Sequence, residues 1–204
     1  MIEVLRGFVP VFFSGFLIDL EIGTLAVALG LAAGLPLALL RLRAPWSRPA
    51  LRLCIRLMQA APVYVIMFFL LHLFPKDVRV AGMPVSITGL AAVILAQAVN
   101  MAAYMAENGH QALEHLARGE RERALLFFPN LLRGFTVVVM SSGIGAAVGV
   151  SEAVGVTLKQ AERLSALGDK VVLFLVVTAF FASLFSAANA LIRRLARRSR
   201  AATA

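Results

Sequence analysis

Five long uncharged stretches constrain this chain more than any other feature of its sequence. They are Ile22–Leu40, Leu57–Phe74, Val80–Ala106, Gly134–Ser151 and Val171–Ile192. A helix of about 20 residues crosses the ~30 Å hydrocarbon core of a bilayer, where lipid satisfies no exposed backbone group. The hydrophobic fraction of 60% agrees with this interpretation. The sequence therefore predicts an all-α integral membrane protein with about five transmembrane helices.

The basic residues between these stretches predict the orientation of the chain. Fourteen of the 20 lie between the first two stretches, between the third and fourth, and after the fifth. Segments rich in Arg and Lys stay in the cytoplasm. We therefore expect the N-terminus outside and the C-terminus inside. Residues 1–21 would form a periplasmic or interfacial segment, residues 22–192 the transmembrane domain, and residues 193–204 a basic cytoplasmic tail near anionic lipids.

No motif for covalent chemistry or nucleotide binding is present in the sequence. It lacks a G-x-x-x-x-G-K-[ST] loop, and its single cysteine and three histidines show no metal-ligand spacing. We expect no catalytic residue, metal or cofactor in this chain, so that energy must come from another chain or an ion gradient. The net charge of +9 is confined to membrane-flanking segments, which argues against nucleic acid as a partner.

The first stretch and its outer boundary carry charged and small residues. Asp19 and Glu21 precede it, and a charged pair at a membrane boundary usually stays hydrated. We expect hydration here rather than a role in a permeation path. Gly23, Gly30 and Gly34 allow another helix to approach closely.

Polar residues in the second and third stretches are our candidates for a translocation path. These candidates are Gln59, Gln97, Asn100, Tyr104 and Glu107. The last four recur every three or four residues and so share one helix face. Because a lipid-facing amide is costly, this face meets either other helices through hydrogen bonds or a water-filled path. Pro62, close after Gln59, either breaks the second helix or is a packing feature.

Residues 108–133, between the third and fourth stretches, alternate charged and apolar side chains at helical spacing. This pattern predicts short helices along the membrane face, which would suit docking of a cytoplasmic partner. The stretch that follows contains Gly134, Gly143, Gly145 and Gly149. Small residues at this density indicate a closely packed or broken helix.

These landmarks are similar to those of a known family, the membrane subunits of bacterial polar amino-acid ABC importers of the histidine/glutamine permease type. The resemblance covers roughly residues 12–198. Gln59–Pro62 stands where the family has Arg-Gly-Thr-Pro, and Ala103–Glu107 resembles its Ala-Tyr-x-Ala-Glu sequence at the inner end of the third helix. Gly119, followed by Glu122 and Ala124, resembles the start of the family's Glu-Ala-Ala loop.

In that family the loop forms a short coupling helix that inserts into a groove of the ATPase subunit. The resemblance implies that the ATPase-coupling residues here are Gly119, Glu122, Arg123, Ala124 and Phe128. Arg123 departs from the second residue of the triplet, and Phe128 replaces an expected glycine. Such departures fit weak docking, a specialised ATPase, or a heteromer whose other permease carries the intact loop; we favour the heteromer.

The resemblance further implies an ABC type I importer permease fold in the bacterial inner membrane. Such a subunit moves a polar amino acid or related small solute by alternating access. The implied partners are an ABC ATPase that holds ATP and Mg, a second permease subunit, a periplasmic solute-binding protein and membrane lipids.

Two other classes remain open. A non-transporting helical subunit that assembles a complex would fit the loss of the loop glycine at Phe128 and the lack of a clear counterpart to the family's path-lining Lys-Asp-Thr-Ser-Leu run. An ion-coupled carrier usually shows repeated halves, and this sequence shows none.

Overall fold

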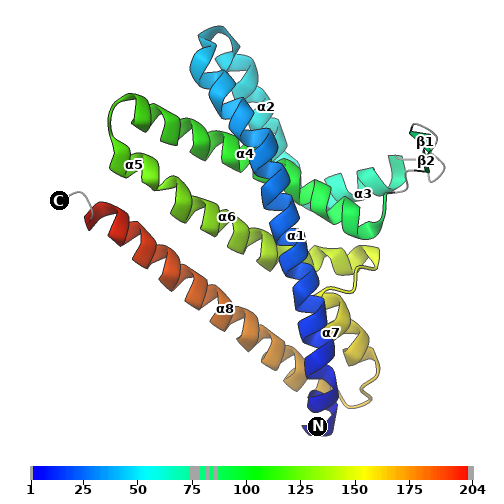
Figure 1. Ribbon diagram of the computed structural model, residues 1–204. Coiled ribbons are helices and arrows are strands. Elements are labelled where there is room, and N and C mark those ends of the chain that lie inside the picture. Colours follow the sequence, from blue (N-terminus) through cyan, green and yellow to red (C-terminus); the bar gives the residue numbers. More distant parts are fainter. Residues whose placement is uncertain (1, 74–78, 81–82, 85–86, 202–204) are drawn as a thin grey trace.

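The computed structural model describes residues 2–73, 79–80, 83–84 and 87–201, and it is helical almost throughout (Figure 1). In chain order the elements are α1 (Ile2–Arg43), the 3-10 helix η1 (Pro45–Ser47), α2 (Arg48–Ala60), α3 (Val63–Leu73), β1 (Arg79–Val80), β2 (Met83–Pro84), α4 (Gly89–Ala117), α5 (Arg121–Leu125), α6 (Phe127–Ser141), the 3-10 helix η2 (Ser142–Val148), α7 (Ala153–Glu162) and α8 (Leu167–Ala201). Strands β1 and β2 form a short antiparallel pair. Parts of the predicted segments, namely residues 1, 74, 81–82, 85–86 and 202–204, lie outside the described residues.

The helices confirm the prediction of about five membrane spans. Among the described residues, four helical stretches are long and apolar enough to cross a bilayer: Arg6–Arg43, Gly89–Ala117, Arg121–Val148 and Leu167–Ala196. A fifth span results if the consecutive helices α2 and α3 are counted together, although they are bent by 89°. The protein is therefore a multi-pass membrane protein.

The bend between α2 and α3 follows from Pro62. The residue before a proline avoids the helical conformation, and Ala61 is extended, with φ −74° and ψ 118°. Proline also donates no backbone hydrogen bond. The structure thus selects the broken helix from the two interpretations of Pro62.

Helix α1 is one continuous helix of 42 residues, so the boundary expected at residue 21 does not coincide with a break. The expectation that Asp19 stays hydrated is wrong, because this residue is only 1% exposed. Its carboxylate accepts hydrogen bonds from Ser142 Oγ at 2.6 Å and from the Ala153 amide at 3.2 Å. Glu21, two residues further along α1, is exposed as expected.

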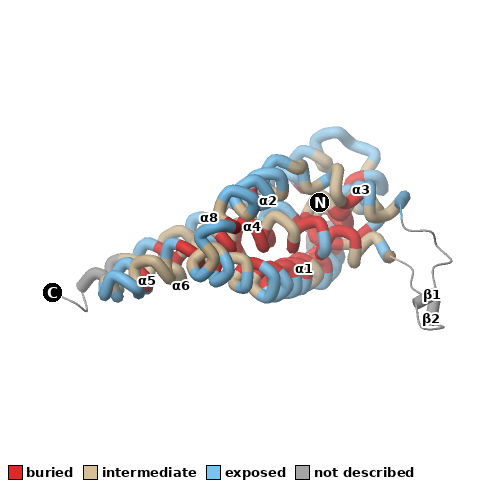
Figure 2. The backbone as a smooth tube through the Cα atoms, turned by 90° about the horizontal axis from the view of Figure 1, so that it is seen from above, coloured by how far each residue is buried: buried red, intermediate tan, exposed pale blue. Residues whose placement is uncertain are grey.

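The main core lies where α1 crosses α4, and the glycines of α1 allow this contact. A Cβ atom at Gly34 would lie 2.5 Å from the Ala102 carbonyl oxygen and 2.8 Å from Met105 Cβ. Gly30 faces Met101 in the same way. Because lipid tails are as apolar as the helices, close van der Waals packing is a main source of association in a bilayer. The predicted close approach at these glycines is confirmed, and Figure 2 shows buried residues concentrated along α1 and α4.

A second apolar cluster joins the outer half of α1 to α7 and α8. The Phe12 ring meets the Phe180 ring edge-on, with centroids 5.1 Å apart. Elsewhere α8 is largely uncovered, since only 11% of the residues in its most apolar segment are buried. Most of the basic tail continues this helix, which ends at Ala201. Its exposed surface is that of a helix facing lipid or another subunit.

The glycine-rich fourth stretch is a broken helix. Helix α6 ends at Ser141, η2 continues to Val148, and Gly149 then adopts φ +81°. Glycine reaches this left-handed conformation without steric cost, which lets the chain reverse into α7. The chain is therefore broken between α6 and α7, as the second of the two predicted alternatives, a broken helix, requires.

The three Arg-rich segments lie toward one end of the bundle. In Figure 1 the connection between α1 and α2, helix α5 and the end of α8 lie toward the top and left, whereas α7 and the start of α8 lie at the bottom. Because the three segments lie at a common end of the bundle, all of them can reach the same aqueous face of the membrane.

Candidate functional site

A cavity of about 430 Å³, whose lining is mainly apolar but includes several polar side chains, lies between α2, α3, α4 and α6. We call it the polar cavity after these side chains. Its polar lining consists of Gln59, Gln97, Asn100, Tyr104, Arg133 and Ser141. Four of the five residues predicted for a translocation path are therefore brought together by the fold. Arg133 and Ser141 were not predicted for this site. The spacing of residues along α4 shows that they share a face, but it does not show which other helix packs against that face.

Two side chains in this cavity bind the facing helix. Gln97 Nε2 donates to Ser141 Oγ at 2.8 Å, and Tyr104 Oη donates to the Asn130 carbonyl oxygen at 3.1 Å. The stripe therefore joins α4 to α6 through hydrogen bonds, as one of the two alternatives predicted, and it also lines a cavity; a translocation path through this cavity stays a prediction. Asn100 differs, because its Nδ2 atom is buried and has no hydrogen-bond partner among the described residues.

Glu107 is not part of the cavity lining. Its Oε2 atom accepts a hydrogen bond from Arg41 Nη1 at 2.6 Å, and its Oε1 atom accepts one from Gln111 Nε2 at 3.4 Å. These contacts tie the end of α1 to α4 beside the Arg-rich connection. The structure therefore places Glu107 in a helix-joining ion pair, apart from the other four candidate residues.

The predicted coupling segment begins at a glycine turn. Gly119 has φ +79°, a conformation in which other residues are strained. The Gly119 amide donates to the Leu116 carbonyl at 3.0 Å and the Glu120 amide donates to the His115 carbonyl at 2.9 Å. These bonds satisfy carbonyl groups at the end of α4, as in other helices that terminate at a left-handed glycine. The turn leads directly into α5.

Helix α5 is short and has distinct inner and outer faces. Glu122 and Arg123 are exposed, whereas Ala124 is 7% exposed and faces the neighbouring helices. Phe128, at the start of α6, is 62% exposed. The predicted coupling residues thus form a compact, outward-facing knob, with the small residue turned inward.

Two residues that sequence analysis did not select hold this knob in place. His115 Nδ1 lies 2.7 Å from Glu120 Oε2, and Arg123 Nη1 donates to the same oxygen at 3.1 Å. The contact with His115, followed by the charge of Arg123, holds the pKa of Glu120 below its usual value. A sequence pattern could have indicated the contact between His115 and Glu120, because these two residues lie on either side of the Gly119 turn.

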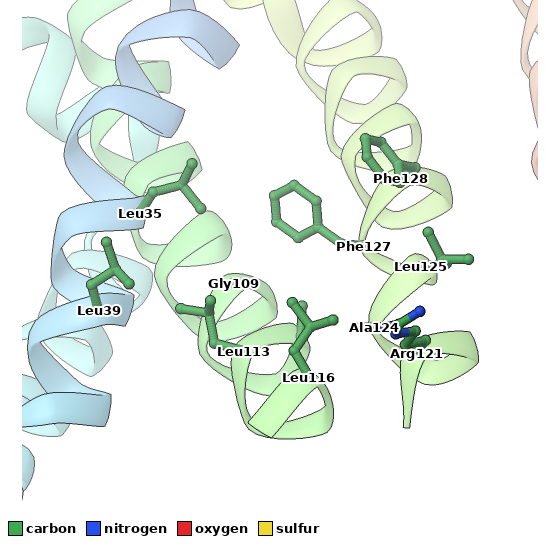
Figure 3. A pocket seen from close by; sticks show the side chains of 11 residues that line it. Leu35, Leu39, Gly109, Leu113, Leu116, Arg121, Ala124, Leu125, Phe127 and Phe128 are labelled. Carbon is green, nitrogen blue, oxygen red and sulfur yellow. The ribbon is translucent and has the colours of Figure 1, made fainter. Parts of the chain in front are cut away.

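An apolar hollow of about 470 Å³ lies beside α5, between α1, α4 and the start of α6. Figure 3 shows the Phe127 ring projecting into this space toward Leu35 of α1. Leu125 and Phe128 line the side formed by α5 and α6. The hollow separates α5 from α1, and α5 packs chiefly against α4, with lesser contacts to α6 and α8.

Buried carboxylates meet where α1 approaches α7. Glu152 caps α7, because its Oε2 and Oε1 atoms accept hydrogen bonds from the Val154 and Gly155 amides at 2.6 and 2.8 Å. Burial raises the pKa of Glu152 to about 7, and the neighbouring Asp19 charge adds to the rise. Sequence analysis did not pair these residues, which lie far apart in the chain.

Comparison with known proteins identifies the class that this fold represents. A family model for "binding-protein-dependent transport system inner membrane component" matches residues 26–127, half of the 204 residues. The chain therefore belongs to this family, the membrane-spanning permeases of ABC transporters. The matched range contains α4, α5 and most of the polar cavity lining.

Two solved structures share the fold. One, described as an amino acid ABC transporter with histidines, aligns over 95% of this chain and 96% of that chain, with a TM-score of 0.72 and 20% identity. The other, the MetNI methionine ABC transporter in inward-facing conformations, aligns over 91% and 96%, with a TM-score of 0.66 and 14% identity. No curated protein matches the sequence. The predicted type I importer permease fold is confirmed.

Proposed function

We propose that this chain is the permease subunit of an importer that moves a polar amino acid or related small solute across the bacterial inner membrane. The observation that carries the proposal is the membership of the chain in the permease family, combined with an outward-facing α5 behind the Gly119 turn. Glu122 and Arg123 are exposed on α5 and free of the helix core, as a docking knob requires.

Transport in this proposal follows from alternating access. Differential contacts of a separate ATPase in its two nucleotide states would rock the helices as rigid bodies. Helix α5 is joined to α4 through Gly119 and continues into α6, and both of these helices line the polar cavity. A displacement of α5 therefore acts directly on the two helices that hold Gln97, Tyr104 and Asn130 together.

The proposed partners complete what this chain lacks. An ABC ATPase would bind ATP and Mg and contact α5. A second permease would face the open side of the polar cavity, and we propose a heterodimer in which that partner carries the intact Glu-Ala-Ala loop. A periplasmic binding protein would deliver solute, and membrane lipids would surround the exposed face of α8.

A non-transporting membrane subunit is the second candidate. The observation that favours it is Phe128, an exposed ring at the position where the family resemblance predicts a glycine. In that case α5 would still hold a partner without driving a pathway. Family membership provides no support for the ion-coupled carrier.

ATP-driven uptake distinguishes the two candidates. The purified complex would be placed in proteoliposomes with ATP at the ATPase side, its binding protein outside and a radiolabelled amino acid mixture as solute. The proposal predicts accumulation that stops when ATP is replaced by a non-hydrolysable analogue. A complex that hydrolyses ATP and accumulates none of the mixture would support the non-transporting subunit.

A further inference from the structure

Two carboxyl groups from distant parts of the chain meet in the buried contact between α1 and α7. Asp19 of α1 is almost fully buried, and Glu152, which caps α7, is fully buried. The two side chains are close enough to share a hydrogen bond. At this level a Cβ atom at Gly15 would lie 2.8 Å from the Glu152 carbonyl carbon. The pair therefore lies where the backbones of α1 and α7 are in direct contact.

No basic side chain balances these two carboxyl groups. Neither of them takes part in an ion pair within the part of the chain that the structure describes. The titratable groups of the elements packed around them lie elsewhere: Glu21, Lys159, Glu162 and Arg163 are exposed, Asp169 and Lys170 lie at the start of α8, Arg133 lies in the first half of α6, those of α4 begin at Tyr104, and η2 has none. Lys159 donates instead to Ser151 Oγ, at 2.7 Å.

The hydrogen bonds around Asp19 indicate that the pair holds a proton. Ser142 Oγ lies 2.6 Å from Asp19 Oδ1 and also 2.6 Å from the Val139 carbonyl oxygen. A hydroxyl group carries one proton, so it cannot donate fully to both acceptors. An ionised Asp19 takes that proton, whereas a protonated Asp19 donates to Ser142 and leaves the hydroxyl proton for Val139. The geometry is therefore fully satisfied when the pair is protonated.

The electrostatics of the pair lead to the same conclusion. The amides of Val154 and Gly155, at the start of α7, donate to Glu152 and stabilise one negative charge there. A second buried charge beside it, without a cation, is strongly unfavourable, so adjacent carboxyl groups keep one proton between them. Loss of that proton is a property of the pair. The pKa of Glu152, raised to about 7 by burial and then by the Asp19 charge, places the loss near neutral pH.

We infer that Asp19 and Glu152 form a pH-sensitive latch, which holds α1 against η2 and α7 while the pair keeps its proton and releases this contact when the proton is lost. In the latched state Asp19 is hydrogen-bonded to Ser142 of η2 and to the Ala153 amide of α7. Without the proton, two like charges repel each other across the contact, and water reaches them only if α1 and α7 separate.

The latch lies away from the Arg-rich segments, since α7 is at the opposite end of the bundle (Figure 1). With the Arg-rich end in the cytoplasm, the pH that acts on the latch is that of the outer aqueous phase. The inference concerns a conformational change at the outer end of the fold. It does not depend on whether the chain takes part in transport.

Distances between spin labels test the release of the latch. The labels would be placed on Ser14→Cys of α1 and Glu162→Cys of α7, both exposed positions, with Cys54→Ser removing the native thiol. The complex purified from native membranes would be measured in nanodiscs. We expect a shift to longer separations when the pH rises from about two units below to about two units above the Glu152 pKa of about 7.

Two substitutions on α1 separate the latch from other effects of pH. Asp19→Asn should abolish the shift, because its amide group replaces the protonated carboxyl group and donates to Glu152 at either pH. Glu21→Gln is the matched control, since Glu21 is exposed two residues further along the same helix. This variant should show the same shift as the unmodified protein. An equal shift in Asp19→Asn would overturn the inference.

Infrared spectroscopy detects the proton itself in the unmodified protein. Exposed carboxyl groups have pKa values of about 4, so at about two units below pH 7 the carbonyl band of a protonated carboxyl group would come from the buried pair. We expect this band at the lower pH and its loss at the higher pH. No band at the lower pH, a band that persists unchanged, or a constant label separation would each overturn the inference. These readouts apply even if Asp19→Asn fails to assemble.

Discussion

Arg41 Nη1 donates to Glu107 Oε2 at 2.6 Å and thereby joins the end of α1 to α4 across 66 positions of the chain. The Arg41 side chain is 13% exposed and the Glu107 side chain 38%. The pair lies at the Arg-rich end of the bundle, just beyond the α1–α4 contact made through Gly34. Glu107 therefore has a structural partner that its position in the polar stripe did not reveal.

Loss of this ion pair should loosen the two helices. We expect Arg41→Ala and Glu107→Ala each to lower stability by about 1 kcal/mol, because the pair is only partly shielded from solvent. Thermal unfolding in nanodiscs measures the effect, and the double variant should show less than the sum of the single effects. Fully additive losses would mean that the two side chains do not interact.

Reversal of the outer charge on α5 should weaken ATPase binding. Glu122 is exposed and outside the core, so Glu122→Lys should insert normally and reduce ATPase co-purification several-fold. The matched control is Glu162→Lys, because Glu162 is exposed on α7 at the opposite end of the bundle. Unchanged ATPase recovery and unchanged uptake with Glu122→Lys would remove this residue from the coupling surface.

A side chain at Gly119 should strain the turn before α5. No atom lies within 4 Å of a Cβ built there, so the cost of Gly119→Ala comes from φ +79° alone. We expect about 1 kcal/mol of destabilisation and a weaker association with the ATPase. Gly168→Ala is the control, because its Cβ also meets no atom and its φ is not positive. Equal thermal stability of the two variants would show that the left-handed turn is not needed.

Glu152 should make stability depend on pH. Its folded-state pKa of about 7 lies above the ordinary value of 4.5, so the folded state binds the proton more tightly than the unfolded state. The contribution of Glu152 to stability is thus fully present below pH 4.5 and is lost as pH rises toward 7. Glu152→Gln should flatten this dependence in unfolding curves across that interval, whereas Glu162→Gln, at an exposed position, should leave it unchanged. An identical pH slope in Glu152→Gln would contradict this account.

Sequence patterns predicted those features that depend only on residues close together in the chain. Uncharged runs indicate spans because every helix must match the bilayer, and Pro62 breaks a helix through its own covalent structure. The stripe from Gln97 to Tyr104 was predicted to share a face because helical spacing alone decides it. Gly119 was selected through the family resemblance, and its positive φ supplies the physical reason.

Contacts between segments that are distant in the chain could not be predicted from the sequence. Asp19 is buried and accepts a hydrogen bond from Ser142, 123 positions away, and no local signal distinguishes that outcome from a hydrated boundary residue. Glu107 continues the spacing of the stripe, but Arg41 draws it into an ion pair. Arg133 was counted among the basic flanking residues, whereas the packing of α6 on α4 brings it to the cavity.

Mild-detergent purification of the tagged protein from its native membranes, with mass spectrometry of the bound proteins, tests the central claim most directly. The permease assignment predicts an ABC ATPase in the preparation, and the proposed heterodimer predicts a second permease beside it. A preparation without any ATPase, confirmed by crosslinking in intact membranes before solubilisation, would contradict the claim that α5 couples this chain to ATP hydrolysis.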